Sequence, residues 1–196
     1  MRFVTERDAL PTELRLALPG LVADHLDGGP RPVLEARMGL VLDLVRANVA
    51  AGGGPFAAAL FEVADGSLVS AGVNMVVASH MPVAHAEVLA IALAGARLGT
   101  FDLSARGPIE LVTSCEPCAM CLGALPWAGV RRLVSGARDV DARRAGFDEG
   151  DKPADWARKL RRRGIEVIGD VAREEAAGLL RAYVDTGGLI YNGRPG

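Results

Sequence analysis

The sequence predicts an α/β protein, folded as a three-layer α/β/α sandwich around a five-stranded mixed sheet. One observation is composition: the chain has 196 residues, 50% of them hydrophobic, which suffices for a sizeable core. The other is order. After a first helix and a hairpin, helical and strand-like segments alternate, which is typical of helices packed on a sheet whose parallel strands are joined by right-handed crossovers.

The first helix is predicted over 34–50, where apolar residues recur at spacings of three and four before a glycine-rich stop. Apolar runs over 56–63 and 67–73, joined by the turn signal Asp65-Gly66, predict an antiparallel hairpin. Because a full helix separates the last two strands, we expect them to be parallel. The remaining elements are expected in the order helix, strand, helix, strand, helix, strand, helix, over 84–98, 109–113, 117–127, 131–135, 153–163, 165–168 and 172–186.

The first 33 residues are rich in proline and glycine and are interpreted as an N-terminal extension of unknown role, with one short helix over 12–18. Residues 34–196 are expected to form the functional domain, ending in a helix and a tail. No stretch approaches the roughly 18 to 20 apolar residues of a membrane span. Charges interrupt any signal-peptide core in the first twenty residues, so a cytoplasmic location is expected.

The charge balance argues against a nucleic-acid partner, since the formal net charge is -2 and such proteins usually carry a basic face. A basic run over 158–163 is expected to be the solvated end of a helix, where cations suit the helix dipole. The three cysteines lie close together in the sequence, which favours metal binding over a disulfide framework in a reducing compartment.

Two short motifs carry the chemistry: His85-Ala86-Glu87 and Pro117-Cys118-Ala119-Met120-Cys121. One imidazole and two thiolates supply three zinc ligands and leave the fourth position open, as in catalytic zinc sites. On a helix, Cys118 and Cys121 share one face at the N-terminal end, which favours thiolates. Glu87 lies about 200° around the helix from His85, so it is expected to act as the general base instead of a ligand. This pair of motifs is the known signature of zinc nucleobase deaminases.

Cys115 leaves two alternatives open. Its spacing to Cys118 and Cys121 resembles part of an iron–sulfur motif, for which no fourth cysteine exists, and a structural zinc site would need Cys115 as its fourth ligand. At the end of a strand, a small buried apolar residue is the ordinary requirement. We predict one zinc ion per chain, bound by His85, Cys118 and Cys121.

The stretch from about residue 34 to 151 resembles the cytidine-deaminase superfamily, and within it the guanine and guanosine deaminases. The resemblance implies a cytidine deaminase-like fold and makes 34–196 a zinc-dependent deaminase domain. The segments that carry it are Gly53-Gly54-Pro55-Phe56, Asn74-Met75-Val76, Ala84-His85-Ala86-Glu87-Val88, Thr113-Ser114-Cys115-Glu116-Pro117-Cys118-Ala119-Met120-Cys121 and Ala145-Gly146-Phe147-Asp148-Glu149.

The resemblance implies roles for single residues. Phe56 would stack on a purine face opposite the His85 imidazole, and Asn74 would hydrogen-bond the base. The backbone N–H of Ala86 would receive the carbonyl group of the base. Glu149 matches a second carboxylate that contacts the substrate and carries protons.

Two further residues are implied at the pocket. Trp127 would help to wall it, and Tyr191 would be lent by the C-terminal tail of a partner in a homodimer; a disordered tail is the alternative. The segment His80-Met81-Pro82-Val83 departs from the Asp-Pro-Thr sequence typical of relatives. Because that loop is expected to border the pocket, the departure bears on substrate identity.

The predicted function is hydrolytic deamination of an amino-substituted heterocycle by a zinc-activated water, with release of ammonia. The resemblance implies guanine or guanosine as the small-molecule substrate, with no nucleic-acid or membrane partner. Deamination of cytosine, a pterin, an aminotriazine or adenosine in tRNA remains an alternative, since residues 132–139 also resemble tRNA adenosine deaminases. A nucleic-acid-binding protein without turnover would need a basic stacking groove, and the intact Glu87 speaks against an inactive zinc scaffold.

Overall fold

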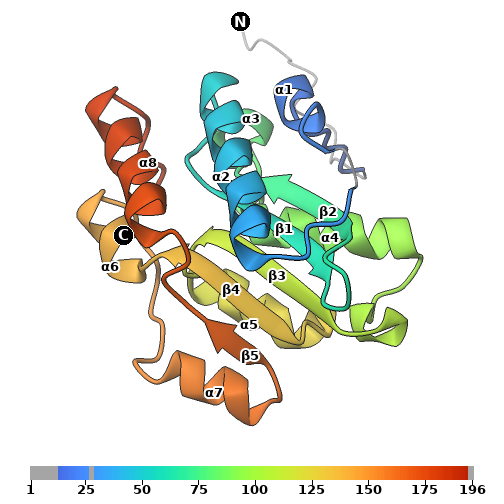
Figure 1. The fold of residues 1–196 in the computed structure, drawn as a ribbon. Coiled ribbons are helices and arrows are strands. Elements are labelled where there is room, and N and C mark those ends of the chain that lie inside the picture. Colours follow the sequence, from blue (N-terminus) through green and yellow to red (C-terminus); the bar gives the residue numbers. More distant parts are fainter. Residues whose placement is uncertain (1–12, 27–28, 194–196) are drawn as a thin grey trace, which may run out of the picture.

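A computed structural model describes residues 13–26 and 29–193 of the chain. Its five strands form one mixed sheet in the order β2-β1-β3-β4-β5 (Figure 1). β1 pairs antiparallel with β2 and β3, whereas β3, β4 and β5 run parallel, which confirms the predicted mixed sheet. The strands are β1 (Ala57–Glu62), β2 (Leu68–Val73), β3 (Ile109–Cys115), β4 (Arg132–Ala137) and β5 (Glu166–Ile168).

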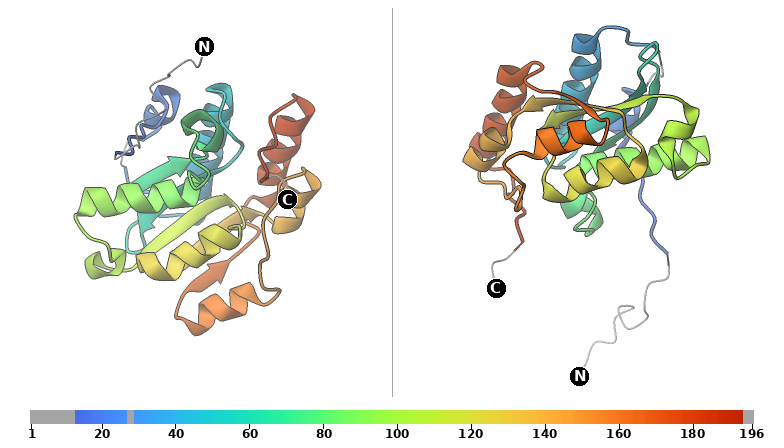
Figure 2. Two further views of the ribbon diagram at one scale, coloured as in Figure 1. Left: turned by 180° about the vertical axis from the view of Figure 1, so that it is seen from behind. Right: turned by 90° about the horizontal axis from the view of Figure 1, so that it is seen from below.

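Helices cover both faces of the sheet, which confirms the three-layer arrangement. One face carries α2 (Leu34–Ala50) and α8 (Arg173–Asp185). The view from behind in Figure 2 shows the other face, with α4 (Ala86–Leu98) and α5 (Ala119–Ala128) lying across it. α7 (Trp156–Arg162) joins the same layer through Leu160. The short helices are α1 (Gly20–Ala23), α3 (Val76–Ser79), η2 (Leu103–Arg106) and α6 (Asp139–Arg144).

The core is divided by the sheet into two hydrophobic clusters. Along β1, Ala57, Ala59 and Phe61 face the α2 side, and Ala58 and Leu60 face the α4 side. This is the alternation that a strand imposes on its side chains. Because helices cover both faces, β1 is buried up to its last residue and β3 throughout, and both strands are mainly apolar.

A buried ion pair ties α2 to the central strand β3. Arg37 Nη1 donates to Glu110 Oε1 at 2.5 Å, and the two side chains are 5% and 0% exposed. The Arg37 guanidinium also donates to the carbonyl oxygens of Arg31 and Pro32. Arg132 Nη1 of β4 lies 3.3 Å from the other carboxylate oxygen, so the charge of Glu110 is balanced from a helix and from the next strand.

Part of the N-terminal extension packs on the fold. Val22 in α1 is fully buried against α2. The helix predicted over 12–18 is wrong, because residues 13–19 have no regular secondary structure and α1 starts only after Pro19; residue 12 lies outside the described residues. A proline disfavours helical backbone at the residue before it, which ends any helix ahead of Pro19. The division of the chain at residues 33 and 34 stays a prediction.

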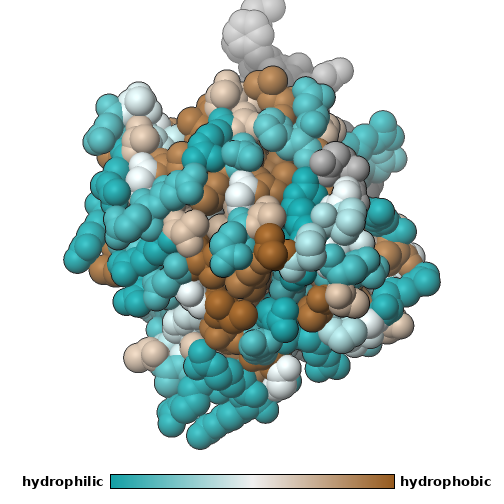
Figure 3. Space-filling view, viewed as in Figure 1, coloured by the Kyte–Doolittle hydropathy of each residue, from teal (hydrophilic) through white to brown (hydrophobic). Residues whose placement is uncertain are grey.

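Other differences are local. α3 and α6 lie between the predicted elements, in segments for which the sequence predicts no helix or strand. The basic run lies on α7 and just beyond it, with Arg158, Lys159 and residues 161–163 exposed, as predicted. Figure 3 shows this lower part of the molecule as hydrophilic. Within the described residues, no helix combines the length and the apolar character needed to cross a membrane.

Candidate metal centre and active site

The predicted metal ligands meet where two helices begin. His85 is the N-cap residue of α4 and Cys118 that of α5, so both helices start two residues later than predicted, and Pro117 precedes α5. The ligand atoms of His85, Cys118 and Cys121 all lie within 4.8 Å of one another. His85 Nδ1 lies 3.5 Å from Cys118 Sγ. One nitrogen and two sulfur donors in this compact arrangement fit a zinc ion with one position left for water or substrate.

The electrostatics of the two sulfurs also favour a cation. Hydrogen bonds from Cys121 and His85 lower the pKa of Cys118 to about 4, although its burial acts the other way. The hydrogen bond to Cys118 and burial raise the pKa of Cys121. A zinc ion binds cysteine as thiolate, so it would hold both sulfurs in the charged form that the surroundings of Cys118 already favour.

Cys115 lies apart from this cluster. It ends β3, is 3% exposed, and its Sγ approaches the carbonyl oxygen of Arg138 at 3.6 Å. Burial raises the pKa of its thiol well above the ordinary value. These features suit a packed thiol and support the prediction that Cys115 is no ligand.

Glu87 is enclosed beside the ligand cluster. It lies in the first turn of α4, is 7% exposed, and its Oε1 accepts a hydrogen bond from Thr113 Oγ1 at 3.4 Å. Desolvation, followed by the nearby Cys118 thiolate, raises the pKa of this carboxyl group. A buried carboxyl group with a raised pKa can accept a proton and give it back, which is what a general acid–base residue must do.

The cluster and Glu87 open onto a cavity of about 680 Å³. Phe56 and Phe147 form an apolar wall, with ring centroids 4.8 Å apart in an edge-to-face arrangement. The Tyr191 ring extends this wall at 5.4 Å from Phe147. Apolar walls with a few fixed polar groups are typical of sites for flat heterocycles. Residues that line the cavity include Phe56, Asn74, His85, Glu87, Glu149 and Tyr191.

Asn48 of α2 holds two sides of this cavity together. Its Nδ2 donates to the carbonyl oxygen of Gly54 at 2.8 Å and to that of Asn74 at 3.0 Å. Phe56 follows Gly54 just before β1, and Asn74 follows β2, so the two cavity residues are positioned by one buried amide. Sequence analysis gave Asn48 no role, although a polar residue on the apolar side of α2 was the available signal.

Three further features that the sequence analysis expected at the cavity lie near it: Asn74, Ala86 and the 80–83 segment. Asn74 is 2% exposed, and its Oδ1 accepts from the Val76 N–H at 3.2 Å. Ala86 begins α4, so its N–H belongs to the first turn, where helical N–H groups have no acceptor within the helix. His80 and Pro82 line the cavity, which confirms that the departing segment borders it.

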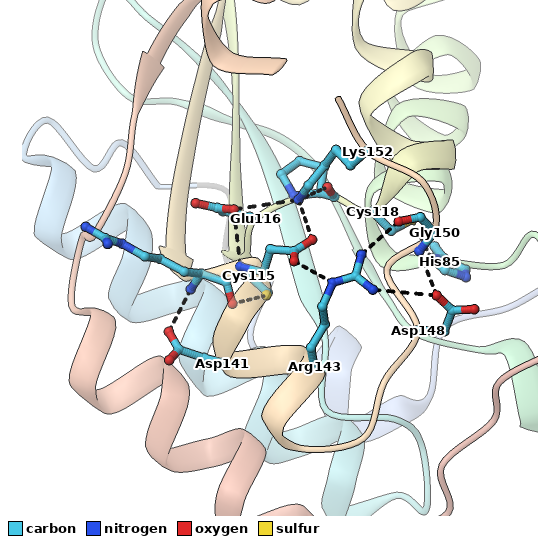
Figure 4. A network of polar contacts seen from close by, with 12 residues as sticks. His85, Cys115, Glu116, Cys118, Asp141, Arg143, Asp148, Gly150 and Lys152 are labelled. Carbon is cyan, nitrogen blue, oxygen red and sulfur yellow. Dashed lines mark hydrogen bonds and ion pairs between the residues drawn. The ribbon is translucent and has the colours of Figure 1, made fainter. Parts of the chain in front are cut away.

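Glu149 reaches the cavity from the loop between α6 and α7. It is 5% exposed, and desolvation together with the Cys118 thiolate raises the pKa of its carboxyl group to about 8. Its carbonyl oxygen accepts from the N–H of Ala119, the first residue of α5, at 2.9 Å. The loop is thereby attached beside the metal ligands, in the network of polar contacts that Figure 4 shows.

Tyr191 lies at the cavity of its own chain. The tail is held there by Asn192, whose Oδ1 accepts from the Asp148 N–H and whose Nδ2 donates to the Gly146 carbonyl oxygen, both at 2.8 Å. The Tyr191 hydroxyl is buried, and no hydrogen-bond partner for it lies among the described residues. Tyr191 thus needs no exchange of tails to reach the site, and the expected loan from a partner stays a prediction.

Trp127 was placed wrongly. It is 89% exposed near the end of α5 and does not line the cavity of the described chain. Six residues of helix separate it from Cys121, which moves it about 9 Å along the axis and roughly 120° around it. The sequence resemblance implied a place for Trp127 at the pocket, but it could not show which way the side chain points from α5. The wall is instead completed by Phe147, which was part of a recognised motif without an assigned role.

Comparison with known proteins agrees with this site. The sequence profile described as the cytidine and deoxycytidylate deaminase zinc-binding region matches residues 33–137, which include all three ligands. A guanine deaminase of Bacillus subtilis is 45% identical over 109 residues, covering 53% of this chain and 67% of that protein. A solved guanine deaminase from Nitrosomonas europaea is 50% identical, with a TM-score of 0.84 over 89% of this chain and 98% of that one. The solved Bacillus subtilis enzyme, 40% identical, gives a TM-score of 0.55 over 63% and 80%. The chain therefore belongs to the cytidine and deoxycytidylate deaminase zinc-binding family.

Proposed function

We propose that this protein is a zinc-dependent guanine deaminase, which converts guanine and water to xanthine and ammonia and acts on the nucleoside by the same chemistry. The observation that carries the proposal is the buried Glu87 beside a three-ligand cluster, in a cavity with an aromatic wall. The two guanine deaminases described above support the choice of substrate. A 50% identical relative was solved in complex with the guanine analogue 8-azaguanine.

Binding depends on groups already in place. Phe56 stacks on one face of the purine, and the apolar wall formed with Phe147 excludes water from that side. Asn74 hydrogen-bonds the ring edge, and the Ala86 N–H receives the carbonyl oxygen at the start of α4, where the helix dipole favours negative charge. Tyr191 extends the same wall beside Phe147, and its buried hydroxyl has no hydrogen-bond partner among the described residues.

Proton transfer depends on Glu87. It accepts the proton released as water adds to the amine-bearing carbon, and it returns that proton to the adjacent ring nitrogen or to the departing amine. A zinc ion held by His85, Cys118 and Cys121 would supply a Lewis acid that activates water and stabilises developing negative charge. A shell of one imidazole and two thiolates cancels the charge of zinc, which increases the demand on Glu87 as a base.

Glu149 acts as the second carboxylate. Guanine carries an N–H beside the carbon under attack, and collapse of the intermediate must deliver protons to the leaving amine. Glu149 lines the cavity together with Glu87, and its pKa of about 8 allows it to carry a proton at neutral pH. It both orients the ring edge and relays protons.

The test is ammonia release from a panel containing guanine, guanosine, cytosine, a pterin, an aminotriazine, adenosine and tRNA. Guanine or guanosine should be turned over fastest, and a chelator should abolish turnover until zinc is restored. Glu174→Gln, which changes an acidic residue in the first turn of α8, serves as a control that keeps full activity. Preferential turnover of cytosine or of tRNA would refute the substrate assignment while leaving the zinc chemistry intact.

The proposal extends to assembly and location. The family resemblance supports a homodimer, and exposed Met120 and Trp127 on α5 offer apolar surface for it. Light scattering on the zinc-loaded protein should give twice the mass of the chain. A cytoplasmic role in purine metabolism is part of the same proposal, and the fraction in which the native protein is recovered tests it.

A further inference from the structure

The loop that carries Glu149 has no regular secondary structure, so its position must come from tertiary contacts. It joins α6 to α7, and its residues 146–150 pass directly beside the start of α5. A reacting group on a loop is effective only if the loop is held, because a displacement of about 1 Å can cost roughly a hundredfold in rate. Lys152 lies on this loop, three residues after Glu149.

Lys152 is a buried lysine with three acceptors. Only 5% of its side chain is exposed. Its Nζ lies 3.0 Å from the carbonyl oxygen of Pro117, 2.9 Å from Asp139 Oδ1 and 3.6 Å from Glu116 Oε2. The contact with Pro117 is a hydrogen bond and the two contacts with carboxylates are ion pairs, so the ammonium charge is balanced inside the fold. Figure 4 shows the ammonium group at the centre of the network, and the Trp156 ring covers it at 5.3 Å.

These contacts join the Glu149 loop (residues 145–155) to the metal-binding loop, which is the segment over residues 116–118 between β3 and α5. Pro117 directly precedes the ligand Cys118, and Lys152 lies three residues after Glu149. One further contact joins the same two segments, since the Ala119 N–H donates to the Glu149 carbonyl oxygen. Arg143 of α6 holds the loop from the other side, with Nη2 donating to the Gly150 carbonyl oxygen at 2.7 Å. Of these contacts, only the one from Lys152 combines a charged donor with nearly complete burial, which makes a hydrogen bond strong and its loss costly.

Lysine is rare in this chain, which sets Lys152 apart. Of 22 basic residues only two are lysines, Lys152 and Lys159, so the other twenty are arginines. Lys159 is exposed and pairs with Asp155 at 3.2 Å. Lys152 occupies an enclosed site in which the acceptor oxygens lie around a single ammonium group. A compact ammonium group suits such a site, whereas the planar fork of arginine suits a flat, bidentate partner.

We propose that Lys152 is a positioning residue for deamination, which fixes the Glu149 loop against the metal-binding loop and so sets where the Glu149 carboxylate stands in the cavity. This inference rests on the proposed role of Glu149. Lys152 itself does not line the main cavity and acts through Glu149. Its removal should therefore slow turnover and leave zinc binding and substrate stacking in place.

The experiment compares Lys152→Met with the matched control Lys159→Met, which removes the same charge from the only other lysine. Zinc content, affinity for 8-azaguanine, kcat and KM for guanine are measured for each. Lys152→Met should retain one zinc per chain and the affinity for 8-azaguanine, while kcat falls about thirtyfold to a hundredfold. Lys159→Met should stay within about twofold of the natural protein, because exposed ion pairs contribute little.

A double-mutant cycle with Glu149→Gln separates positioning from a general loss of structure. If Lys152 acts through Glu149, adding Lys152→Met to Glu149→Gln should lower kcat by less than about threefold more, since coupled residues are not additive. Fully additive losses, or an unchanged kcat in Lys152→Met alone, would overturn the inference. Full activity of Glu149→Gln would remove the proposed role of Glu149 as well, so the two failures are distinguishable.

Lys152→Gln covers the case in which Lys152→Met does not fold. Glutamine keeps an N–H donor for the Pro117 carbonyl oxygen but loses the charge, and it should fold, bind zinc and show an intermediate kcat. Loss of zinc from Lys152→Gln would show that Lys152 supports the metal centre itself and would overturn the inference.

Discussion

Replacing Asn48 by alanine should weaken both the fold and substrate binding. The substitution removes the two hydrogen bonds that this buried amide donates to the carbonyl oxygens of Gly54 and Asn74. A buried acceptor left without a donor costs about 1 to 3 kcal/mol. Two such groups give roughly 2 to 6 kcal/mol, which the higher helix propensity of alanine offsets by about 0.5 kcal/mol. Entry of water into the space would reduce the cost further, so we expect a loss of about 2 to 4 kcal/mol in the free energy of unfolding.

Function should be affected through binding more than through chemistry. Asn48 holds the backbone next to Phe56 and Asn74. In the proposed mechanism both residues contact the substrate, and neither takes part in proton transfer. Loss of binding that is equal in the ground and transition states raises KM with little change in kcat. We therefore expect the KM for guanine to rise about tenfold or more, equivalent to about 1.4 kcal/mol.

The assay is urea unfolding of the zinc-loaded protein, followed by guanine kinetics under native conditions. Asp43→Ala is the matched control, since Asp43 is an exposed polar residue on the same helix and pairs with Arg46 at 2.8 Å. It should change the free energy of unfolding by no more than about 0.5 kcal/mol. A loss below about 1 kcal/mol for Asn48→Ala with an unchanged KM would refute the reasoning, because the two carbonyl groups would then find other donors at no cost.

Four further outcomes are expected. Glu87→Gln should retain zinc and 8-azaguanine affinity while turnover falls about a hundred- to ten-thousand-fold; activity within a few-fold of the natural protein would contradict its role as the base. Metal analysis should find one zinc per chain in Cys115→Ala and none in Cys118→Ala, and equal losses would identify Cys115 as a ligand. Arg37→Met should lower the free energy of unfolding by less than the roughly 3 to 5 kcal/mol of a fully broken buried ion pair, because Arg132 Nη1 still lies 3.3 Å from Glu110 Oε2; calorimetry would detect the change. Deleting residues 187–196 should reduce guanine turnover by opening the cavity beside Phe147, and a fully active truncated enzyme would show that the tail is dispensable.

The long helices, the strands and the metal-binding chemistry could be predicted from the sequence. Periodicity located the long helices and the hairpin because each of these elements buries one face, and burial imposes a repeat on the side chains. The ligand set could be predicted because zinc accepts few donor types, and two short motifs contain all three. Boundaries were less certain: His85 and Cys118 proved to be N-cap residues, since local sequence does not decide which of two adjacent residues takes the first helical conformation.

Only the tertiary structure decided which side chains share the cavity. Trp127 lies on the helix that follows a recognised motif, yet its position around α5 leaves its side chain exposed to solvent. Asn48 and Lys152 lie outside the motifs, and their roles depend on carbonyl groups from distant segments. Neither partner can be read from local sequence, because a hydrogen bond across the fold depends on how separate elements pack. Metal ligands are identified by chemical type, whereas positioning residues are identified by distance, and distances between remote residues exist only once the sheet and its helices have assembled.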